Sequence, residues 1–325
     1  MNLSMAVSGI IKSGVRFRRK VTMFTVDKLF YGAAALGQLH PLSRPERHGL
    51  VRTRDVFYGH DPIHRLDVWR SATEQPKGAI LYVHGGGFRI LSKDTHWIMA
   101  LMFARAGWVV FNIDYHLAPA HPFPSAIRDV ALAYEWVCDH VKEYGVDPSR
   151  VVIAGESAGG NLVTALTLAT CFERPEPWAR SVFAHGVVPA AVLPACGLLQ
   201  VTEPERFRSR WPHMSRAAHD QIVVIAGEYL GEEKHTPETL DFANPLVALE
   251  RDEPSARPLP PFFIACGTRD PLLDDARRLH RALEKRGAHS ELALYPGELH
   301  AFHAAVMTPN ARRFWRDTYA FLERT

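Results

Sequence analysis

The sequence predicts an α/β fold in which a mostly parallel central sheet carries helices on both faces. Short apolar runs rich in β-branched residues alternate with longer stretches of helical periodicity, from about residue 79 to 171 and again from 261 to 322. Strands joined by crossover helices of this length pair in parallel and bury both faces of their sheet. The chain has 325 residues, 47% of them apolar and 22% charged, which suits a soluble protein with a substantial core.

The chain is predicted to have four parts. Residues 1–50 are expected to form an amino-terminal helical cap segment, 51–202 and 245–325 the two parts of the α/β domain, and 203–244 a cap or lid insertion. Gly37 and Pro41 are expected to end the amino-terminal helix. Its apolar face comprises Phe24, Val26, Leu29, Phe30, Ala33, Ala34 and Leu36.

An antiparallel hairpin is expected before the alternating region. Its strands are predicted at 56–58 and 66–69, around a His-Asp-Pro turn at 60–62. The following strands are predicted at 79–84, 108–113, 151–154, 261–266 and 290–295, and the helices at 95–106, 124–144, 158–171, 273–286 and 310–322.

The stretch from Glu203 to Asn244 interrupts this alternation. It is polar, rich in His, Arg, Glu and Pro, and contains one helical patch at 215–230. Together with the amino-terminal helix it is expected to form a lid over the carboxyl ends of the strands, where ligands bind in open α/β sheets.

Charge and cysteine usage indicate a cytoplasmic protein without nucleic-acid partners or stable membrane insertion. The formal net charge is only +3, and the basic cluster Arg16–Lys20 is interpreted as a solvated helix face rather than a membrane or nucleic-acid site. The first residues do not resemble a signal peptide, and no run of 18 apolar residues is present. Four widely spaced cysteines, without metal-ligand spacing to histidine, are expected to be buried free thiols: Cys138, Cys171, Cys196 and Cys266.

A serine lies between two glycines directly after a β-branched run. The pentapeptide Gly-Glu-Ser-Ala-Gly at 155–159 follows the apolar run 151–154 and precedes a helix-forming stretch. This order predicts a sharp strand–turn–helix that presents Ser157 in a strained backbone conformation. A serine hydroxyl is a weak nucleophile, so the turn implies catalysis only if a base and an anion site accompany it.

Three consecutive glycines follow another predicted strand. The sequence His84-Gly85-Gly86-Gly87 comes directly after the apolar run that ends at Val83. Such a loop can be merely flexible, can cradle phosphate, or can aim its N–H groups at a developing oxyanion. No lysine stands at the phosphate-loop spacing and no Gly-x-Gly-x-x-Gly pattern is present, so an alkoxide site is favoured.

An acid and a base follow two later strands in turn. Asp270 could cap the next helix, but Asp274 and Asp275 suit that role at least as well and leave Asp270 free. His300, with His303 on the same loop, follows the last predicted strand. The resulting order Ser–Asp–His is the order found where a serine turn of this kind is catalytic.

Taken together, these motifs resemble the α/β-hydrolase fold, and more narrowly the hormone-sensitive-lipase-like esterases, the bacterial family IV carboxylesterases. The resemblance covers roughly residues 78–320. It includes His-Gly-Gly-Gly at 84–87, Asp-Tyr-His-Leu-Ala-Pro at 114–119 with His-Pro-Phe-Pro at 121–124, and the elbow Gly-Glu-Ser-Ala-Gly-Gly-Asn at 155–161. Asp-Pro-Leu at 270–272 and His-Ala-Phe at 300–302 complete it.

The resemblance implies the roles of the site residues. It makes Ser157, Asp270 and His300 a catalytic triad, and gives the oxyanion hole to Gly86, Gly87 and the amide of Ala158. His84 would hold the glycine loop in shape, with Gly85 and Glu156 as supporting residues. No metal and no organic cofactor are expected, and the family suggests a homodimer.

Four positions depart from the family pattern. Glu156 stands in place of the commoner aspartate, His116 and Ala120 in place of arginine and glutamate, and Ala301 in place of glycine. None of them removes a reacting group, but each can change loop packing and substrate preference. The segment 193–201 matches the family poorly.

The predicted function is a serine carboxylesterase that hydrolyses small-molecule esters with short to medium acyl chains through an acyl-enzyme. An amide- or thioester-cleaving enzyme with the same triad remains an alternative, as does a non-catalytic ligand receptor, which the retained triad disfavours. Haloalkane and epoxide chemistry is disfavoured because those enzymes carry aspartate at the elbow. Four aromatic residues either line the pocket or pack the lid against the core: Trp97, Phe207, Trp211 and Tyr229.

Overall fold

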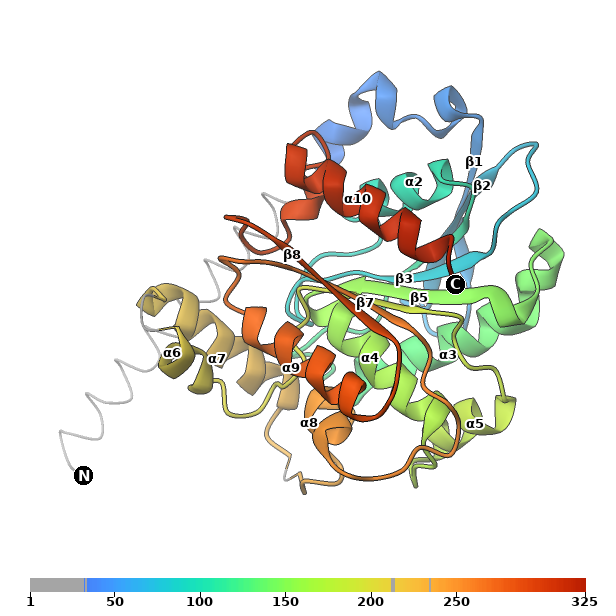
Figure 1. Ribbon diagram of the computed structural model, residues 1–325. Coiled ribbons are helices and arrows are strands. Elements are labelled where there is room, and N and C mark those ends of the chain that lie inside the picture. Colours follow the sequence, from blue (N-terminus) through green and yellow to red (C-terminus); the bar gives the residue numbers. More distant parts are fainter. Residues whose placement is uncertain (1–31, 33, 212–213, 234) are drawn as a thin grey trace, which may run out of the picture.

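The computed structural model describes residues 32, 34–211, 214–233 and 235–325, built around one eight-stranded sheet (Figure 1). The strand order is β1-β2-β4-β3-β5-β6-β7-β8. The strands are β1 (Leu50–Phe57), β2 (Arg65–Ser71), β3 (Ala79–Val83), β4 (Val109–Ile113), β5 (Val151–Glu156), β6 (Val192–Ala195), β7 (Phe262–Gly267) and β8 (Ser290–Tyr295). β2 pairs antiparallel with β1 and β4, whereas the six strands β3 to β8 run parallel to one another. The predicted fold class is therefore confirmed.

Helices cover both faces of the sheet. In Figure 1, α2 (Trp97–Arg105) and α10 (Pro309–Leu322) lie on one face. The opposite face carries α3 (Ser125–His140), α4 (Ala158–Cys171), α8 (Pro245–Glu250) and α9 (Leu273–Lys285), with α5 (Pro177–His185) beside them. Short 3-10 helices occupy Pro41–Ser43, Pro45–His48, Val141–Tyr144, Pro148–Arg150 and Phe302–Ala304.

Burial explains why the central elements were predictable. Every residue of β3, β4 and β5 is buried, because these strands are covered on both faces and flanked on both edges. Helix α4 is buried along its whole length, between the sheet and its neighbouring helices. The core is therefore continuous from the sheet into the layer that contains α4.

Several predicted elements need correction. The predicted hairpin is present, but its first strand begins at Leu50 instead of residue 56. The start was missed because this edge strand carries polar residues and has a bulge at Asp55, whose φ is 54°. The helix predicted at 124–144 ends at His140 and continues as a 3-10 turn. Strand β6 was not predicted: it has four residues, and Pro194 within it argues against a central strand.

The insertion between β6 and α8 contains two helices, α6 (Arg206–Arg210) and α7 (Arg216–Leu230). In Figure 1 they lie beyond one end of the sheet, next to the start of α9. The limits of the cap segments stay a prediction.

The amino-terminal helix ends at Leu39, between its two predicted terminators, Gly37 and Pro41. Residues 34–39 are helical, so Gly37 does not terminate the helix. Leu36, predicted on the apolar face, is exposed. The rest of that face, except Ala34, and the cluster Arg16–Lys20 lie outside the described residues.

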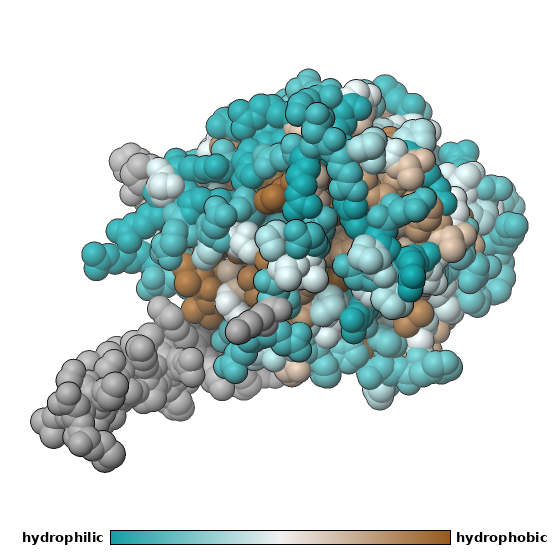
Figure 2. Space-filling model, turned by 90° about the horizontal axis from the view of Figure 1, so that it is seen from below, coloured by the Kyte–Doolittle hydropathy of each residue, from teal (hydrophilic) through white to brown (hydrophobic). Residues whose placement is uncertain are grey.

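One face of the molecule is seen in a space-filling view. Figure 2 shows a mostly hydrophilic face with hydrophobic residues in small groups. Among the described helices, none combines the length and the apolar character that a bilayer crossing requires. All four cysteines are free and buried, as predicted.

Candidate active site

Ser157 occupies the turn between β5 and α4 in a conformation that residues with a Cβ atom rarely adopt. Its φ is 52° and its ψ is −115°. The Ser157 N–H donates to Ala195 O at 2.9 Å, and the Ser157 carbonyl accepts from the N–H groups of Asn161 at 3.1 Å and Leu198 at 3.2 Å. These three bonds fix the turn to both the helix and the strand beside it.

Two glycines allow this turn because strand and helix approach closely. A Cβ at Gly159 would lie 2.0 Å from Val83 O, and one at Gly155 would lie 2.5 Å from Gly159 O. Side chains at either position would overlap backbone atoms of the central sheet or of α4. The small residues on both sides of Ser157 thus have a steric cause.

The loop after β3 turns sharply under the insertion. Gly86 and Gly87 have φ of 108° and 60°, and a Cβ at Gly86 would lie 2.0 Å from Ile90 O. The side chain of Ile225 in α7 packs against Gly87. Within the described chain, the backbone N–H groups of Gly86, Gly87 and Ala158 donate no hydrogen bond to another residue.

His84 is a buried structural residue at the base of this loop. Its ring stacks on Tyr115 with 4.3 Å between centroids, and its Nδ1–H donates to Gly85 O at 2.7 Å. The Tyr115 hydroxyl donates to His84 O at 2.8 Å. Burial and the neighbouring His96 lower the pKa of His84 to about 3, so its ring is neutral at physiological pH.

Glu156 joins three parts of the site through one buried carboxylate. Its Oε1 accepts from His96 Nε2 at 2.8 Å, and its Oε2 lies 2.7 Å from His303 Nε2. The same side chain packs against Gly85. Burial alone would raise the pKa of Glu156, but His96 and His303 hold it well below its ordinary value. Neither histidine partner could be identified from the sequence, because no local spacing relates them.

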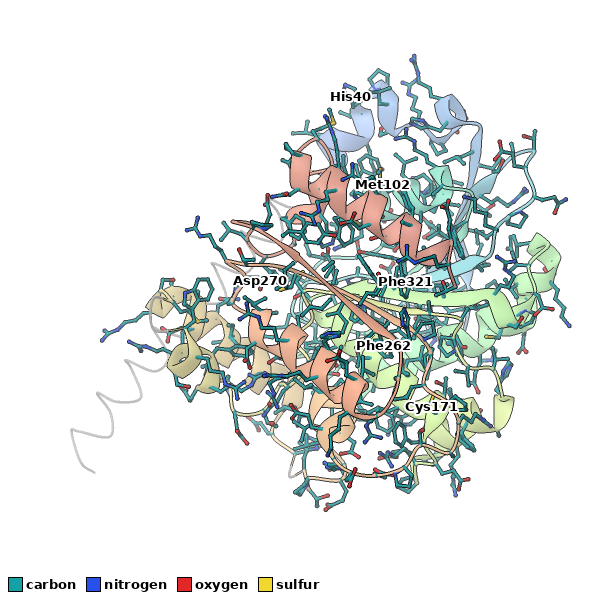
Figure 3. The ribbon with its side chains drawn as sticks, viewed as in Figure 1. His40, Met102, Cys171, Phe262, Asp270 and Phe321 are labelled. Carbon is teal, nitrogen blue, oxygen red and sulfur yellow. The ribbon has the colours of Figure 1, made fainter. Side chains whose placement is uncertain are left out.

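Asp270 and His300 are paired at the carboxyl ends of β7 and β8. Asp270 is buried; its Oδ1 accepts from Leu272 N–H at 2.8 Å and its Oδ2 from His300 Nδ1–H at 2.9 Å. Figure 3 places Asp270 at the end of the sheet beside the insertion, whereas Phe262, at the start of β7, lies well away from it. About 35% of the His300 side chain remains exposed.

The charge state of His300 is set by opposing effects. Burial lowers its pKa, but Asp270 and Cys196 raise it well above the ordinary value. Cys196, directly after β6, has φ of 39°. Its Sγ lies within 4.8 Å of a carboxylate oxygen of Asp270 and of a ring nitrogen of His300. The sequence predicted only that this thiol is buried, because its segment lacks the family pattern.

The structure brings Asp270 and His300 into contact, but the Ser157 hydroxyl forms no hydrogen bond with either of them. In the described part of the chain, no hydrogen bond involves the Ser157 hydroxyl. Because Nδ1 of His300 donates to Asp270, Nε2 is the ring nitrogen left for a further partner.

Residues of the insertion pack against the glycine loop and line a pocket beside Asp270. Phe207 and Trp211 line a pocket of about 210 Å³ together with Asp270. Tyr229 is buried and stacks on Phe88 with 3.7 Å between centroids, so it packs the insertion against the glycine loop. Trp97 is buried in α2.

Comparison with known proteins defines the class. A model of the α/β-hydrolase fold family matches residues 80–304. Acetyl esterases of Salmonella enteritidis and Salmonella typhi are each 32% identical over 240 residues, covering 71% of this chain and 68% of theirs.

Solved structures agree with this class. An esterase of the bacterial hormone-sensitive lipase family shares 26% identity and a TM-score of 0.69, covering 92% of this chain and 90% of its own. The esterase LipW from Mycobacterium marinum has the same fold, with a TM-score of 0.73, 24% identity, and coverage of 92% and 88%.

The chain therefore belongs to the α/β-hydrolase fold family. Within it, the protein is a hormone-sensitive-lipase-like carboxylesterase, a carboxylic ester hydrolase.

Proposed function

We propose that Ser157 is the nucleophile of a triad with His300 and Asp270. The observation that carries this proposal is the buried Asp270 carboxylate, 2.9 Å from Nδ1 of a partly exposed histidine. This bond orients the imidazole and leaves Nε2 to take the proton from a serine that a strained turn presents. Because Asp270 stabilises the imidazolium, His300 can hold the proton while the ester is attacked.

The proposed oxyanion hole consists of the N–H groups of Gly86, Gly87 and Ala158. Its support is that these three groups have no hydrogen-bond acceptor among the described residues. Each such donor is worth about 3 kcal/mol of transition-state stabilisation. After the alcohol leaves, His300 would activate water to hydrolyse the acyl-enzyme.

The proposed substrates are esters of short to medium acyl chains. This preference is supported by the related Salmonella proteins, which are acetyl esterases. We place the enzyme in the cytoplasm, in keeping with its free thiols.

The test is Ser157→Ala, assayed on p-nitrophenyl esters from acetate to decanoate, with a p-nitroanilide and a thioester for comparison. The turnover number is expected to fall by about four to six orders of magnitude. Ser181→Ala is the matched control, because this exposed serine on α5 bonds only Glu135, and it should retain full activity. Full activity in Ser157→Ala would refute the nucleophile, and wild-type preference for the anilide or thioester would refute the substrate class.

A further inference from the structure

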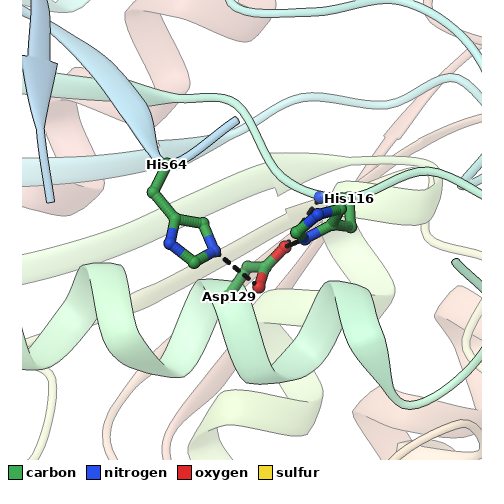
Figure 4. Close-up of side chains that lie close together, drawn as sticks. All are labelled: His64, His116 and Asp129. Carbon is green, nitrogen blue, oxygen red and sulfur yellow. Dashed lines mark hydrogen bonds and ion pairs between the residues drawn. The ribbon is translucent and has the colours of Figure 1, made fainter. Parts of the chain in front are cut away.

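Three side chains with metal-binding chemistry converge away from the proposed active site. We call His64, His116 and Asp129 the His–Asp–His cluster (Figure 4). His64 Nε2 lies 3.0 Å from Asp129 Oδ1, and His116 Nδ1 lies 2.8 Å from Asp129 Oδ2. They come from the β1–β2 turn, the loop after β4, and α3. Residues far apart in the sequence are thus fixed around one carboxylate.

Among the described residues, this carboxylate has no lysine or arginine partner. Asp129 is buried, and its donors are the two imidazoles and the backbone N–H of His116 at 2.7 Å. No lysine or arginine of the described chain forms an ion pair with it. The resemblance described above places an arginine at position 116, where a permanent guanidinium charge would be available. In this chain two imidazoles occupy that place, and a cation bound between them would supply the positive charge.

Two imidazoles and one carboxylate form a ligand set suited to zinc and similar divalent transition metals. Their candidate ligand atoms all lie within 4.8 Å of one another. Bond lengths to Zn²⁺ of about 2.0–2.2 Å require the ligand atoms to lie closer than twice that length, so modest side-chain movement suffices. All three side chains are largely buried, with 13%, 17% and 9% exposed for His64, His116 and Asp129.

The neighbours of the cluster supply outer contacts and an approach from solvent. Nε2 of His116 lies 3.6 Å from Asp61 Oδ2, so its N–H would face a carboxylate once Nδ1 binds a metal. The exposed ring of His121 lies 4.1 Å from that of His116, measured between centroids. One contact opposes binding: His64 Nδ1 accepts from Asp61 N–H at 3.3 Å, and this long bond is lost when Nε2 binds the ion.

We propose that the His–Asp–His cluster is a binding site for a divalent transition metal such as Zn²⁺, held by His64 Nε2, His116 Nδ1 and the Asp129 carboxylate. The ion supplies the positive charge that position 116 no longer provides. It also joins the β1–β2 turn to the loop after β4. That loop contacts the glycine loop through the bond from Ala118 N–H to Phe88 O at 2.8 Å. The bound ion therefore stabilises the glycine loop indirectly, through the loop after β4.

The test is calorimetric titration of Zn²⁺ into the full chain after removal of metal with EDTA. We expect saturable binding to this cluster with micromolar or tighter affinity, and a higher melting temperature. His116→Arg restores a permanent cation beside Asp129 and should weaken this binding at least a hundredfold, while cooperative unfolding confirms that the variant is folded. His185→Arg is the matched control, because His185 contacts a single carboxylate, Asp139, and binding should be unchanged.

Two further variants keep the test decisive. Cys196→Ser removes one ligand of the second possible group, which also contains Asp270 and His300. Zn²⁺ bound at that group would be weakened by this variant and would inhibit ester hydrolysis, whereas Zn²⁺ bound at the His–Asp–His cluster would do neither. His64→Gln replaces His116→Arg if the latter does not fold. Absence of binding below 1 mM in the wild type, or equal affinity in the cluster variants, would overturn the proposal.

Discussion

Adding one methyl group to Gly159 is expected to destabilise the protein severely, whereas the same change at Gly227 is expected to stabilise it. Both glycines lie within helices, α4 and α7. A Cβ at Gly159 would lie 2.0 Å from Val83 O, whereas at Gly227 no described atom lies within 4 Å. The two substitutions therefore test packing at constant chemistry.

The magnitude follows from the overlap. Ordinary contact begins at 3.4 Å, so α4 and β3 must separate by about 1.4 Å, the difference between 3.4 and 2.0 Å. β3 is paired with β4 and β5 on its two edges, so it cannot move alone. Overpacking of this kind costs about 1–3 kcal/mol or more, and a backbone obstacle favours the upper end. In Gly227→Ala the helix gains about 0.5–1 kcal/mol.

Urea unfolding followed by circular dichroism measures both changes. We expect the midpoint to fall in Gly159→Ala and to rise in Gly227→Ala at an unchanged slope. Ester hydrolysis should fall sharply in Gly159→Ala, because Ser157 is two residues away, and should persist in Gly227→Ala. Equal stability of Gly159→Ala and wild type, or effects of the same sign in both, would refute the packing argument.

Three other predictions concern ionisable groups. Since Asp270 raises the pKa of His300, kcat/KM is expected to rise with pH through the neutral range. Asp270→Asn should move the midpoint of this pH profile to lower pH and reduce the turnover number by about 10⁴-fold. A profile that is flat from pH 5 to 9 would contradict this. The pKa of His84 is about 3 instead of 6.5, so this neutral ring stabilises the fold fully above pH 6.5, and about 5 kcal/mol is lost as pH falls towards 3. Urea midpoints at pH 7 and pH 4 should therefore differ more in wild type than in a folded His84→Gln variant, and equal differences would exclude His84 as the cause. Burial raises the pKa of Cys138 to about 12 and of Cys171 to about 11, so a disulfide-exchange reagent at pH 8 should modify neither thiol before unfolding; rapid labelling of the native protein would show that they are accessible.

The sequence was informative where structure is encoded locally. The apolar runs of β3, β4 and β5 predict buried strands because both faces of each strand contact helices. The turn at Ser157 is also predictable, because its glycines, the strand before it and the helix after it are consecutive in the sequence. By contrast, β6 was not predicted because Pro194 interrupts its apolar run. The edge strand β1 was only partly predicted because it carries many polar residues.

Contacts between distant segments were beyond sequence reasoning. Glu156 was singled out as a substitution, but its bonds to His96 and His303 depend on how two loops fold over β5. The position of Cys196 beside His300 likewise depends on the placement of β6 in the sheet. Charged groups that pair across the fold leave no periodic signal, so their partners become visible only in three dimensions.

The packing of α7 on the glycine loop links two events that are usually considered separately. Ile225 contacts Gly87, and Glu228 forms an ion pair with Arg89, only a few residues further along the loop. Phe123 N–H donates to Tyr229 O at 2.7 Å, which attaches the same helix to the loop after β4. A movement of α7 must therefore also disturb the backbone around Gly87. Under the proposed function, the position of α7 affects the geometry of the N–H groups that would receive the charge of the ester oxygen, so variants on α7 should alter the turnover number as well as the substrate range.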